Sequence, residues 1–478
     1  MKKELKTKIV LLSIFSITNL WFINLGKSKA RKPASVVTTS TGEMSLLEDI
    51  QYKNGFDILS PTPGSAVKTG LLQAGSQVGK VPAYNLAQWY SKSDIVSSSP
   101  IQRPSGAYIW KDLNKEIIYG QPGTSEEGIT LSVNSFNEYS NRFRDGSTKD
   151  WPHLYISQDM GKRLPSIKEL STVRLTMEAK LIRAIEKMSD GFNPSIHTAQ
   201  YVVYFLIQNL NQQSPGYGND FVNFGFSLYD SRYTFPSSFV MPDPDGGHLI
   251  WQMGLNQLTS KSLKSKEWVS INKNIFSDIR KSVQYAIDKG VFKSKDLSDY
   301  YLSSMVAGWE VPGLSDVSIQ VKNFNIYAST WNDPVVFQFN SNNETEGWVN
   351  LGAQAEKRLP QDGIWKLLAK ASRMSCIENT SLNINAAKFK KIKLKILAKK
   401  EFGKSDGAYI NWRNSSLSKN TSSPRMDLPL IYDNHWHDYV LDMSGQPEWK
   451  DGITSLSIFY GFQGTRAHVA FDSIEFVE

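Results

Sequence analysis

Apolar and polar residues alternate along much of the first two thirds of the chain. Alternation of this kind points successive side chains to opposite faces of a β-strand. Clusters of Gly, Pro, Asn and Asp separate the alternating segments and indicate turns. The predicted strands are 106–113, 128–136, 151–160, 171–182, 198–210, 220–230, 247–254 and 316–328. Together they predict one β-rich unit over residues 55–328.

One segment of this unit has the period of an α-helix instead. The stretch "FSDIRKSVQYAIDKG" predicts an amphipathic helix with an apolar stripe, a serine cap and a glycine stop. The stripe is Phe276, Ile279, Val283 and Ile287, the cap is Ser277 and the stop is Gly290. Many strands with a single helix favour two packed β-sheets.

The segment "STWNDP" (329–334) marks a boundary, because a second series of strand patterns begins after it. One of these, "KFKKIKLKILAKK" (388–400), predicts a strand with a lysine-lined face. Residues 334–478 are numerous enough for a second small sandwich. The predicted fold class is therefore all-β: two β-sandwich or jelly-roll domains in tandem, with one helix inserted in the first.

The first residues have the pattern of a secretory signal. A basic start, "MKKELKTK", is followed by an apolar run and by a small-x-small pattern that ends at Ala30. We therefore expect a signal peptide over 1–30 and a flexible, Ser/Thr-rich lead-in over 31–54. This predicts a secreted, extracellular or periplasmic protein with no membrane span after signal cleavage. The alternative is an uncleaved anchor, since the apolar run is slightly long for a signal.

Composition narrows the function classes. Cys376 is the only cysteine, so the exported chain has no internal disulfide and no thiolate zinc cluster. A formal net charge of +8 includes lysines of the signal, and nucleic-acid binding is not expected of an exported chain. The 13 Trp, 20 Tyr and 23 Phe suit β-sheets, and their flat rings also suit sugar binding.

The second unit resembles the jelly-roll carbohydrate-binding modules at the ends of secreted bacterial polysaccharide-processing proteins. The resemblance covers nearly all of residues 334–478. It rests on "FNSNNETEGW", "DGIWKL", "AYINWR", "NHWHDYVLDM" and the closing "AFDSIEFV". It implies sugar contacts at Trp412, Arg413 and Trp436, of which at least one tryptophan is expected in the core. It also implies a structural Ca²⁺, for which Asp472, Glu346 and Asn340 are the candidate ligands.

The first unit resembles, in general pattern, the concanavalin A-like lectin and glucanase sandwiches. The matching stretches are "WPHLYISQD", "HTAQYVVYFLIQNLN" and "GWEVPGLSDVSIQVKNFNIYA". No Glu-x-Asp-x-x-Glu strand is present, so the resemblance implies a sandwich without assigning a reaction. Such sandwiches host lectins, hydrolases and lyases alike.

Three strands of the first unit each have one polar face. If 171–182, 198–210 and 220–230 lie side by side, these faces form a floor for a sugar chain. The alternative is the solvated face of an ordinary antiparallel sheet. Amide and phenol groups favour a binding site, and the predicted substrate contacts are Arg174, Gln200, Tyr204, Asn223, Tyr229 and Trp309.

Three activities fit such a floor. A retaining glycosidase needs two carboxyl groups about 5 Å apart. Glu178, between Thr176 and Lys180 on its face, suits the ionised nucleophile, and Glu310 suits the acid if the adjacent Trp309 desolvates it.

A polysaccharide lyase needs a group that neutralises a uronate and a His or Tyr that moves protons. Arg174, Gln200, His197 and Tyr204 have the right chemistry, but alternation places His197 opposite Gln200. The third activity is glycan binding without catalysis, as in an adhesin.

Other chemistries have weaker support. There is no Gly-x-Ser-x-Gly motif, and His435 and His437 lack further nearby ligands for zinc. The sequence thus predicts a secreted protein that recognises a polysaccharide or oligosaccharide. Glycoside hydrolysis is favoured if the protein is catalytic.

Overall fold

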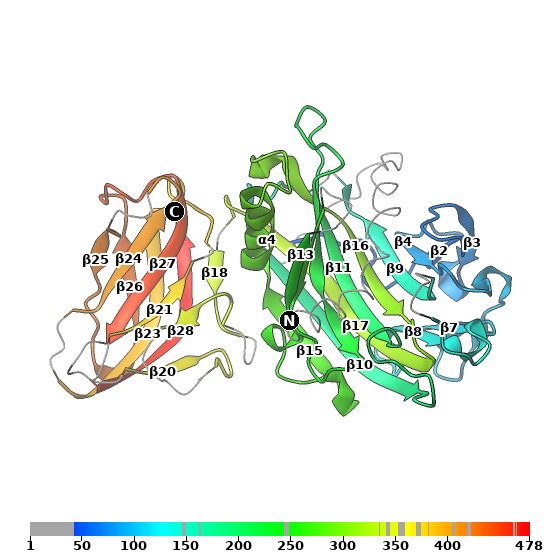
Figure 1. The fold of residues 1–478 in the computed structure, drawn as a ribbon. Helices are drawn as coiled ribbons and strands as arrows, with labels where there is room; N and C mark the ends of the chain where they lie inside the picture. Colours follow the sequence, from blue (N-terminus) through cyan, green and yellow to red (C-terminus); the bar gives the residue numbers. More distant parts are fainter. Residues whose placement is uncertain are drawn as a thin grey trace.

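The structure is a computed structural model. It describes residues 43–145, 150–161, 164–242, 248–333, 335–340, 345–351, 359–369, 374–380, 382–403, 407–417, 422–461, 464 and 466–478. The predicted signal peptide and the first part of the predicted lead-in lie outside these residues. Figure 1 shows two β-rich units, with the C-terminal unit beside the larger N-terminal one.

Two sheets form the larger unit, and residues 44–330 supply their strands. Sheet A has the order β15(Val269–Asn274), β10(Leu170–Glu186), β17(Ser315–Thr330), β8(Gly128–Asn134), β7(Lys115–Gly120), β6(Tyr108–Lys111) and β5(Ile101–Gln102), with β1(Met44–Ser45) on β17. Sheet B has the order β13(Phe239–Pro242), β14(His248–Met253), β12(Phe221–Asp230), β11(Gln200–Asn209), β16(Tyr300–Glu310), β9(His153–Asp159), β4(Tyr84–Ala87), β2(Phe56–Leu59) and β3(Lys68–Leu72).

Two further sheets form the C-terminal unit from residues 335–477. Sheet C has the order β18(Val335–Phe337), β28(Arg466–Val477), β23(Lys391–Phe402) and β26(Asp433–Asp442), with β20(Trp365–Ala369) on β28. Sheet D has the order β19(Val349–Asn350), β21(Ser375–Asn379), β27(Gly452–Gly461), β24(Tyr409–Asn414) and β25(Arg425–Asp427), with β22(Ile384–Asn385) on β27. The predicted all-β fold is confirmed.

Two α-helices are described. The predicted helix is α4(Phe276–Asp288), and Gly290 follows it with φ +70°, as a glycine stop does. Its N-cap is Ile275 rather than Ser277. The other helix, α3(Ser135–Glu138), is a single turn after β8. Short 3₁₀ turns are η1(Gly75–Gln77), η2(Ile95–Ser97), η4(Leu255–Gln257), η5(Leu263–Ser265) and η6(Leu297–Asp299).

The core of the larger unit lies between sheets A and B. Val173, Leu175 and Met177 of β10 face this core, as do Tyr201 and Val203 of β11. Alternation correctly predicts the apolar side of these strands, except at the end of β12, where Tyr229 of the predicted polar side is also in this core. The predicted polar floor combines three strands, however, and only β11 and β12 are neighbours. β10 belongs to sheet A, so the three-strand arrangement is wrong.

The N-terminal residues complete this sandwich. Met44 and Ser45 pair with β17, and Tyr52 is buried, so the described part of the predicted lead-in is folded.

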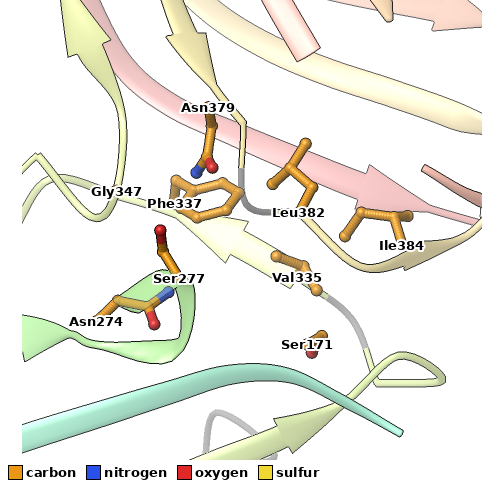
Figure 2. Close-up of a pocket in the computed structure, with 9 residues that line it drawn as sticks. All are labelled: Ser171, Asn274, Ser277, Val335, Phe337, Gly347, Asn379, Leu382 and Ile384. Atoms are coloured by element: carbon orange, nitrogen blue, oxygen red, sulfur yellow. The ribbon is translucent and has the colours of Figure 1, made fainter. Parts of the chain in front are cut away.

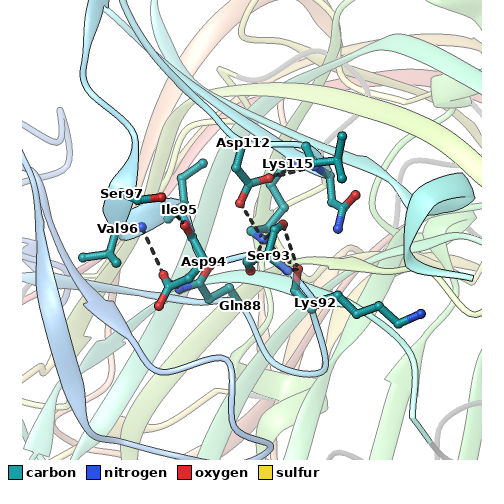
Figure 3. A network of polar contacts seen from close by, with 12 residues as sticks. Gln88, Lys92, Ser93, Asp94, Ile95, Val96, Ser97, Asp112 and Lys115 are labelled. Atoms are coloured by element: carbon teal, nitrogen blue, oxygen red, sulfur yellow. Dashed lines mark hydrogen bonds and ion pairs between the residues drawn. The ribbon is translucent and has the colours of Figure 1, made fainter.

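A buried lysine of β7 contacts the loop that follows β4 (Figure 3). Lys115 Nζ donates to Ser91 Oγ at 2.6 Å and pairs with Asp112 at 2.8 Å, and burial lowers its pKa.

The two units meet at the start of β10 and at α4. The buried Asn383 side chain donates to the carbonyls of Lys168 (3.0 Å) and Leu170 (2.7 Å). Arg280 of α4 donates to the Leu382 carbonyl at 3.3 Å. Figure 2 shows a pocket at this junction, lined by Ser171, Asn274, Ser277, Val335, Phe337, Gly347, Asn379, Leu382 and Ile384.

Trp309 links the two sheets of the larger unit. Its ring packs edge-on against Tyr201 and Tyr229, and its Nε1 donates to the Leu131 carbonyl of β8 at 2.8 Å. Trp309 therefore faces the core, opposite to Glu310 on the next position of β16.

Replacement of this tryptophan is expected to be costly. Trp309→Ala should lower the free energy of unfolding by about 3–5 kcal/mol, because it leaves a large cavity between the sheets. The half-exposed Trp436 is the control, and Trp436→Ala should change stability by less than about 0.5 kcal/mol. Denaturant unfolding measures both, and equal effects would contradict the placement of Trp309 in the core.

Candidate functional site

One side of sheet B carries a row of polar residues that faces away from the inter-sheet core. In the strand register, His153 of β9 lies opposite Glu310 of β16, which lies opposite Gln200 of β11. Gln200 in turn lies opposite Asp230 of β12. Residues directly opposite in antiparallel strands share a face. We call this side the polar face, which also contains Tyr155, Ser157, Tyr204, Asn223, Ser227, Gln252 and Ser304.

The polar face is enclosed by the protein. Glu310 is 1% exposed, Gln200 2% and Asp230 3%. A second apolar cluster shares the face, formed by Leu59, Ala87, Trp89, Tyr155, Val202, Tyr204, Leu206, Phe221, Ile250 and Val306. Polar groups in such surroundings interact strongly because little water screens them.

Burial keeps the Glu310 carboxyl protonated at neutral pH. Desolvation raises its pKa from 4.5 to about 8, and the Tyr155 hydroxyl and the Trp151 indole offset part of the rise. Tyr155 donates to Glu310 Oε1 at 2.7 Å, while Oε2 has no hydrogen-bond partner. A protonated carboxyl whose second oxygen has no partner in the protein can donate a proton to a ligand that reaches it.

Gly308 allows β9 to approach β16 beside this carboxyl. A Cβ atom at position 308 would lie 2.0 Å from the Leu154 carbonyl oxygen and 2.8 Å from the Tyr155 Cα. Both atoms belong to backbone, which cannot move aside cheaply. A side chain here would therefore push away the strand that carries Tyr155.

Hydrogen bonds fix other side chains of the polar face. Gln200 Nε2 donates to Asp230 Oδ2 at 2.7 Å, and Arg232 pairs with the same carboxylate at 2.7 Å. Gln252 Oε1 accepts from Tyr204 (2.9 Å) and Ser227 (3.0 Å). The Asp230 carboxylate, which only accepts, fixes the Gln200 amide, and the Ser237 carbonyl, which accepts from Gln252 Nε2 at 2.9 Å, fixes the Gln252 amide.

Several buried polar atoms of this face have no partner among the described residues. Native structures satisfy nearly all buried polar groups, so each exception points to water or a ligand. Both donors and acceptors are present, as a ligand rich in hydroxyls requires. The atoms are His153 Nδ1, Ser157 Oγ, Gln200 Oε1, Asn223 Nδ2 and Oδ1, Ser304 Oγ and Glu310 Oε2.

His153 is neutral beside Glu310. Complete burial lowers its pKa to about 3, so it carries no charge at the pH values where proteins normally work. The two described neighbours of Glu310 in its row are His153 and Gln200, and neither is a carboxylate. The described part of the row gives Glu310 no adjacent nucleophile.

Glu178 lies elsewhere, so its predicted pairing with Glu310 is wrong. It is on β10 of sheet A, where Asn323 Nδ2 donates to Oε1 at 2.7 Å and Lys322 lies 3.8 Å from Oε2. Glu310 is on sheet B, and the two strands face the core from opposite sheets. Alternation assigns a residue to a face, but it does not say which sheet the strand joins.

Three other predicted contacts are also away from the polar face. Arg174 is on sheet A, where it pairs with Glu43 and stacks 4.5 Å over Tyr327. Trp309 and Tyr229 contact each other in the inter-sheet core. Gln200, Tyr204 and Asn223 are on the polar face, as predicted.

His197 has a structural role at the start of β11. Its Nδ1 accepts from the Asn193 N–H at 2.9 Å, and its Nε2 lies 2.7 Å from the Arg144 carbonyl. Burial lowers its pKa. Because Arg174 is on sheet A and both ring nitrogens of His197 contact backbone groups, the predicted lyase set does not come together.

The C-terminal unit separates its predicted sugar contacts. Trp412 is completely buried and packs edge-on against Trp449 at 5.8 Å, so it belongs to the core. Arg413 is on sheet D, whereas Trp436 is on sheet C and is 37% exposed. Lys395 lies 5.8 Å from the Trp436 ring, at the edge of the predicted lysine-lined strand face.

The three predicted calcium ligands have other partners. Asp472 pairs with Lys395 at 3.2 Å, and the Glu346 carboxylate accepts from the Gln338 and Phe339 N–H groups. Asn340 Nδ2 donates to the Gln338 side chain at 2.8 Å. Calcium binding stays an untested prediction. Within the described ranges, no group of three or more His, Cys, Asp or Glu is placed to hold a metal ion.

His153, Tyr155 and Asp230 are the site residues that the sequence did not single out. Alternation in the sequence could have identified two of them, since His153 and Tyr155 alternate with Leu154 and Ile156 in a predicted strand. Asp230 ends β12, where a shift in the strand register restores it to the polar face. Such a bulge has no reliable sequence signal.

Comparisons with known proteins give matches by structure but none by sequence. No protein-family model and no curated protein matches the sequence. Similar solved structures include an endoglucanase Cel12A from Rhodothermus marinus, with 12% identity, a TM-score of 0.27, and coverage of 49% of this chain and 96% of that chain. A family 11 xylanase from Neocallimastix patriciarum has 9% identity, a TM-score of 0.26, and coverage of 48% and 95%.

A tandem pair of CBM22 domains of Paenibacillus barcinonensis Xyn10C has 8% identity, a TM-score of 0.24, and coverage of 81% and 98%. At these identities and TM-scores the likeness carries no argument about function. Among the described residues, no helix is long and apolar enough to cross a membrane.

The raised pKa of Glu310 predicts a pH-dependent stability. The unfolded chain releases this proton above pH 4.5, whereas the folded protein holds it until about pH 8. The contribution of Glu310 to stability is therefore greatest below pH 4.5 and decreases up to about pH 8. The decrease should be a few kcal/mol, at about 1.4 kcal/mol per unit of pKa shift.

Glu310→Gln removes this titration and is isosteric. Urea unfolding between about pH 5 and pH 8 should show wild type losing stability relative to the variant as pH rises. Parallel pH profiles for the two proteins would show that Glu310 has an ordinary pKa in the folded state.

Proposed function

We propose that the polar face binds an extracellular polysaccharide and that Glu310 is the acid that cleaves it. The observation that carries this proposal is the buried Glu310 carboxyl, protonated at neutral pH, whose buried Oε2 has no hydrogen-bond partner among the described residues. A glycosidic oxygen needs a proton as its bond breaks, and a carboxylic acid with a pKa near working pH supplies it.

The surroundings of Glu310 support a sugar as the ligand. Unpartnered atoms of Gln200, Asn223 and Ser304 include hydrogen-bond acceptors and donors on the same face. Sugar hydroxyls both donate and accept. The apolar side chains between these groups, such as Val202 and Tyr204, suit the C–H faces of a sugar ring.

A second candidate function is glycan binding without cleavage. The row neighbours of Glu310 are His153 and Gln200 rather than a carboxylate. This observation favours a binding protein, because hydrolysis also requires a group that activates water or attacks the sugar.

One comparison tests the acid role and separates the two candidates. Wild type, Glu310→Gln and Glu178→Gln are incubated with cellohexaose, laminarihexaose and xylohexaose, and released sugars are quantified. We expect Glu310→Gln to lose at least about 100-fold in kcat, the usual contribution of a general acid. Its affinity for the oligosaccharide should change little.

Glu178→Gln is the matched control, and it should keep full activity because Glu178 is on the other sheet. Binding without release by wild type would assign the protein to the noncatalytic class. Full activity of Glu310→Gln would contradict the acid role. A wild type that binds no glycan would contradict the proposed function.

We propose that Trp436 contributes the aromatic contact of the C-terminal unit. Its exposed ring is on sheet C, so it does not share a face with Arg413 of sheet D. Trp436→Ala should weaken polysaccharide binding about tenfold, the scale of one aromatic contact, in gel affinity electrophoresis. Arg413→Ala should leave binding unchanged. The reverse pattern would place the sugar on sheet D.

A further inference from the structure

Gln200 lies between Glu310 and Asp230 on the polar face. It is directly opposite Glu310 across one strand boundary and directly opposite Asp230 across the other. Its Nε2 donates to Asp230 Oδ2 at 2.7 Å, while its buried Oε1 has no partner. Gln200 thus has one end satisfied by the protein and one buried acceptor without a partner, on the face that also carries Glu310.

Asp230 is itself fixed in place. Its Oδ1 accepts from the Arg232 backbone N–H and Nε, both at 2.9 Å, and its Oδ2 accepts from Arg232 Nη2 at 2.7 Å. Arg232 is only 10% exposed in its side chain, so water screens this pair little. A paired carboxylate of this kind stays in one orientation and accepts only.

An acceptor-only neighbour determines the orientation of an amide. Asp230 requires the Nε2 end of Gln200, and Oε1 must then point the other way. With a neutral amide in place of the Asp230 carboxylate, both orientations would be satisfied. The negative charge of Asp230 therefore decides whether Gln200 offers an acceptor or a donor at the polar face.

We propose that Asp230, held by Arg232, is a positioning residue that fixes Gln200 so that Oε1 accepts a hydrogen bond from a sugar hydroxyl beside Glu310. This inference rests on the proposed function. It specifies that the bound sugar has a free hydroxyl on the unit next to the cleaved bond. Asp230 does not touch the ligand. It acts through Gln200.

Asp230→Asn tests this orientation with little change in shape. The introduced oxygen stays with the two Arg232 donors that bind Oδ1, so the introduced Nδ2 takes the place of Oδ2, faces Gln200 and leaves Arg232 Nη2 without this acceptor. The Gln200 amide then turns as well and presents Nε2 to the sugar. In the protein with Glu310 intact, we expect KM for the hydrolysed oligosaccharide to rise about tenfold. The sugar hydroxyl then loses one hydrogen bond, because it meets a donor where Gln200 Oε1 accepted. The kcat should stay within about threefold, because Glu310 is unchanged.

A double exchange restores the acceptor. In Asp230→Asn/Gln200→Glu, one oxygen of the introduced carboxylate accepts from the introduced amide, and the other oxygen again faces the ligand. This variant is compared with Asp230→Asn in the Glu310→Gln background, where a second charge cannot alter the acid. Calorimetric titration with the three hexasaccharides should show affinity lost about tenfold in the single exchange and recovered to within about threefold in the double exchange.

The outcomes separate this inference from the proposed function. If Glu310→Gln binds none of the three sugars, the proposed function fails and the positioning role fails with it. If the sugar binds and Asp230→Asn binds it equally well, only the positioning role is overturned. A loss of affinity that the double exchange does not recover would show that Asp230 merely holds the end of β12, and thermal unfolding would report that loss of stability.

Discussion

Exclusion of water from the polar face of sheet B determines the chemistry of its side chains. Enclosure of the Glu310 carboxyl, rather than any nearby charge, raises its pKa to about 8. The same enclosure strengthens the bonds of Tyr155 and the Asp230–Arg232 pair, and it leaves polar atoms such as Gln200 Oε1 unsatisfied. A face of this kind is costly unless water or a ligand completes it. Its polar content therefore points to bound water or a bound ligand.

Sheet geometry places these groups where they can act together. β-Strands lie about 4.8 Å apart, so the row from His153 to Asp230 crosses its strands within about 15 Å. Glu310 and Gln200 are neighbours in this row, and Trp309 on the next position of β16 anchors the strand in the core. A residue of the polar face and a residue of the inter-sheet core thus alternate along one strand. The C-terminal unit is joined to the larger one through Asn383 rather than through a long linker.

Alternation in the sequence predicted the faces of strands but not their neighbours. It placed Gln200, Tyr204 and Asn223 on one face and Val173, Leu175 and Met177 in the core, as the structure has them. It could not say that β10 pairs with β15 and β17, since the partners of a strand depend on contacts far apart in the chain. The pairing of Glu178 with Glu310 failed for this reason. The tryptophans are a second example. The sequence predicts Trp309, Trp412 and Trp436 as sugar contacts, whereas in the structure Trp309 and Trp412 are in the core and Trp436 is exposed.

The ionisation of Glu310 in the folded protein tests the central claim most directly. A ¹³C NMR titration of the protein labelled at glutamate side-chain carboxyls, with Glu310→Gln used to assign the resonance, follows this group alone. Enclosure predicts a midpoint near pH 8. A midpoint near 4.5, the value of a glutamate in water, would mean that water reaches the polar face and would contradict the account.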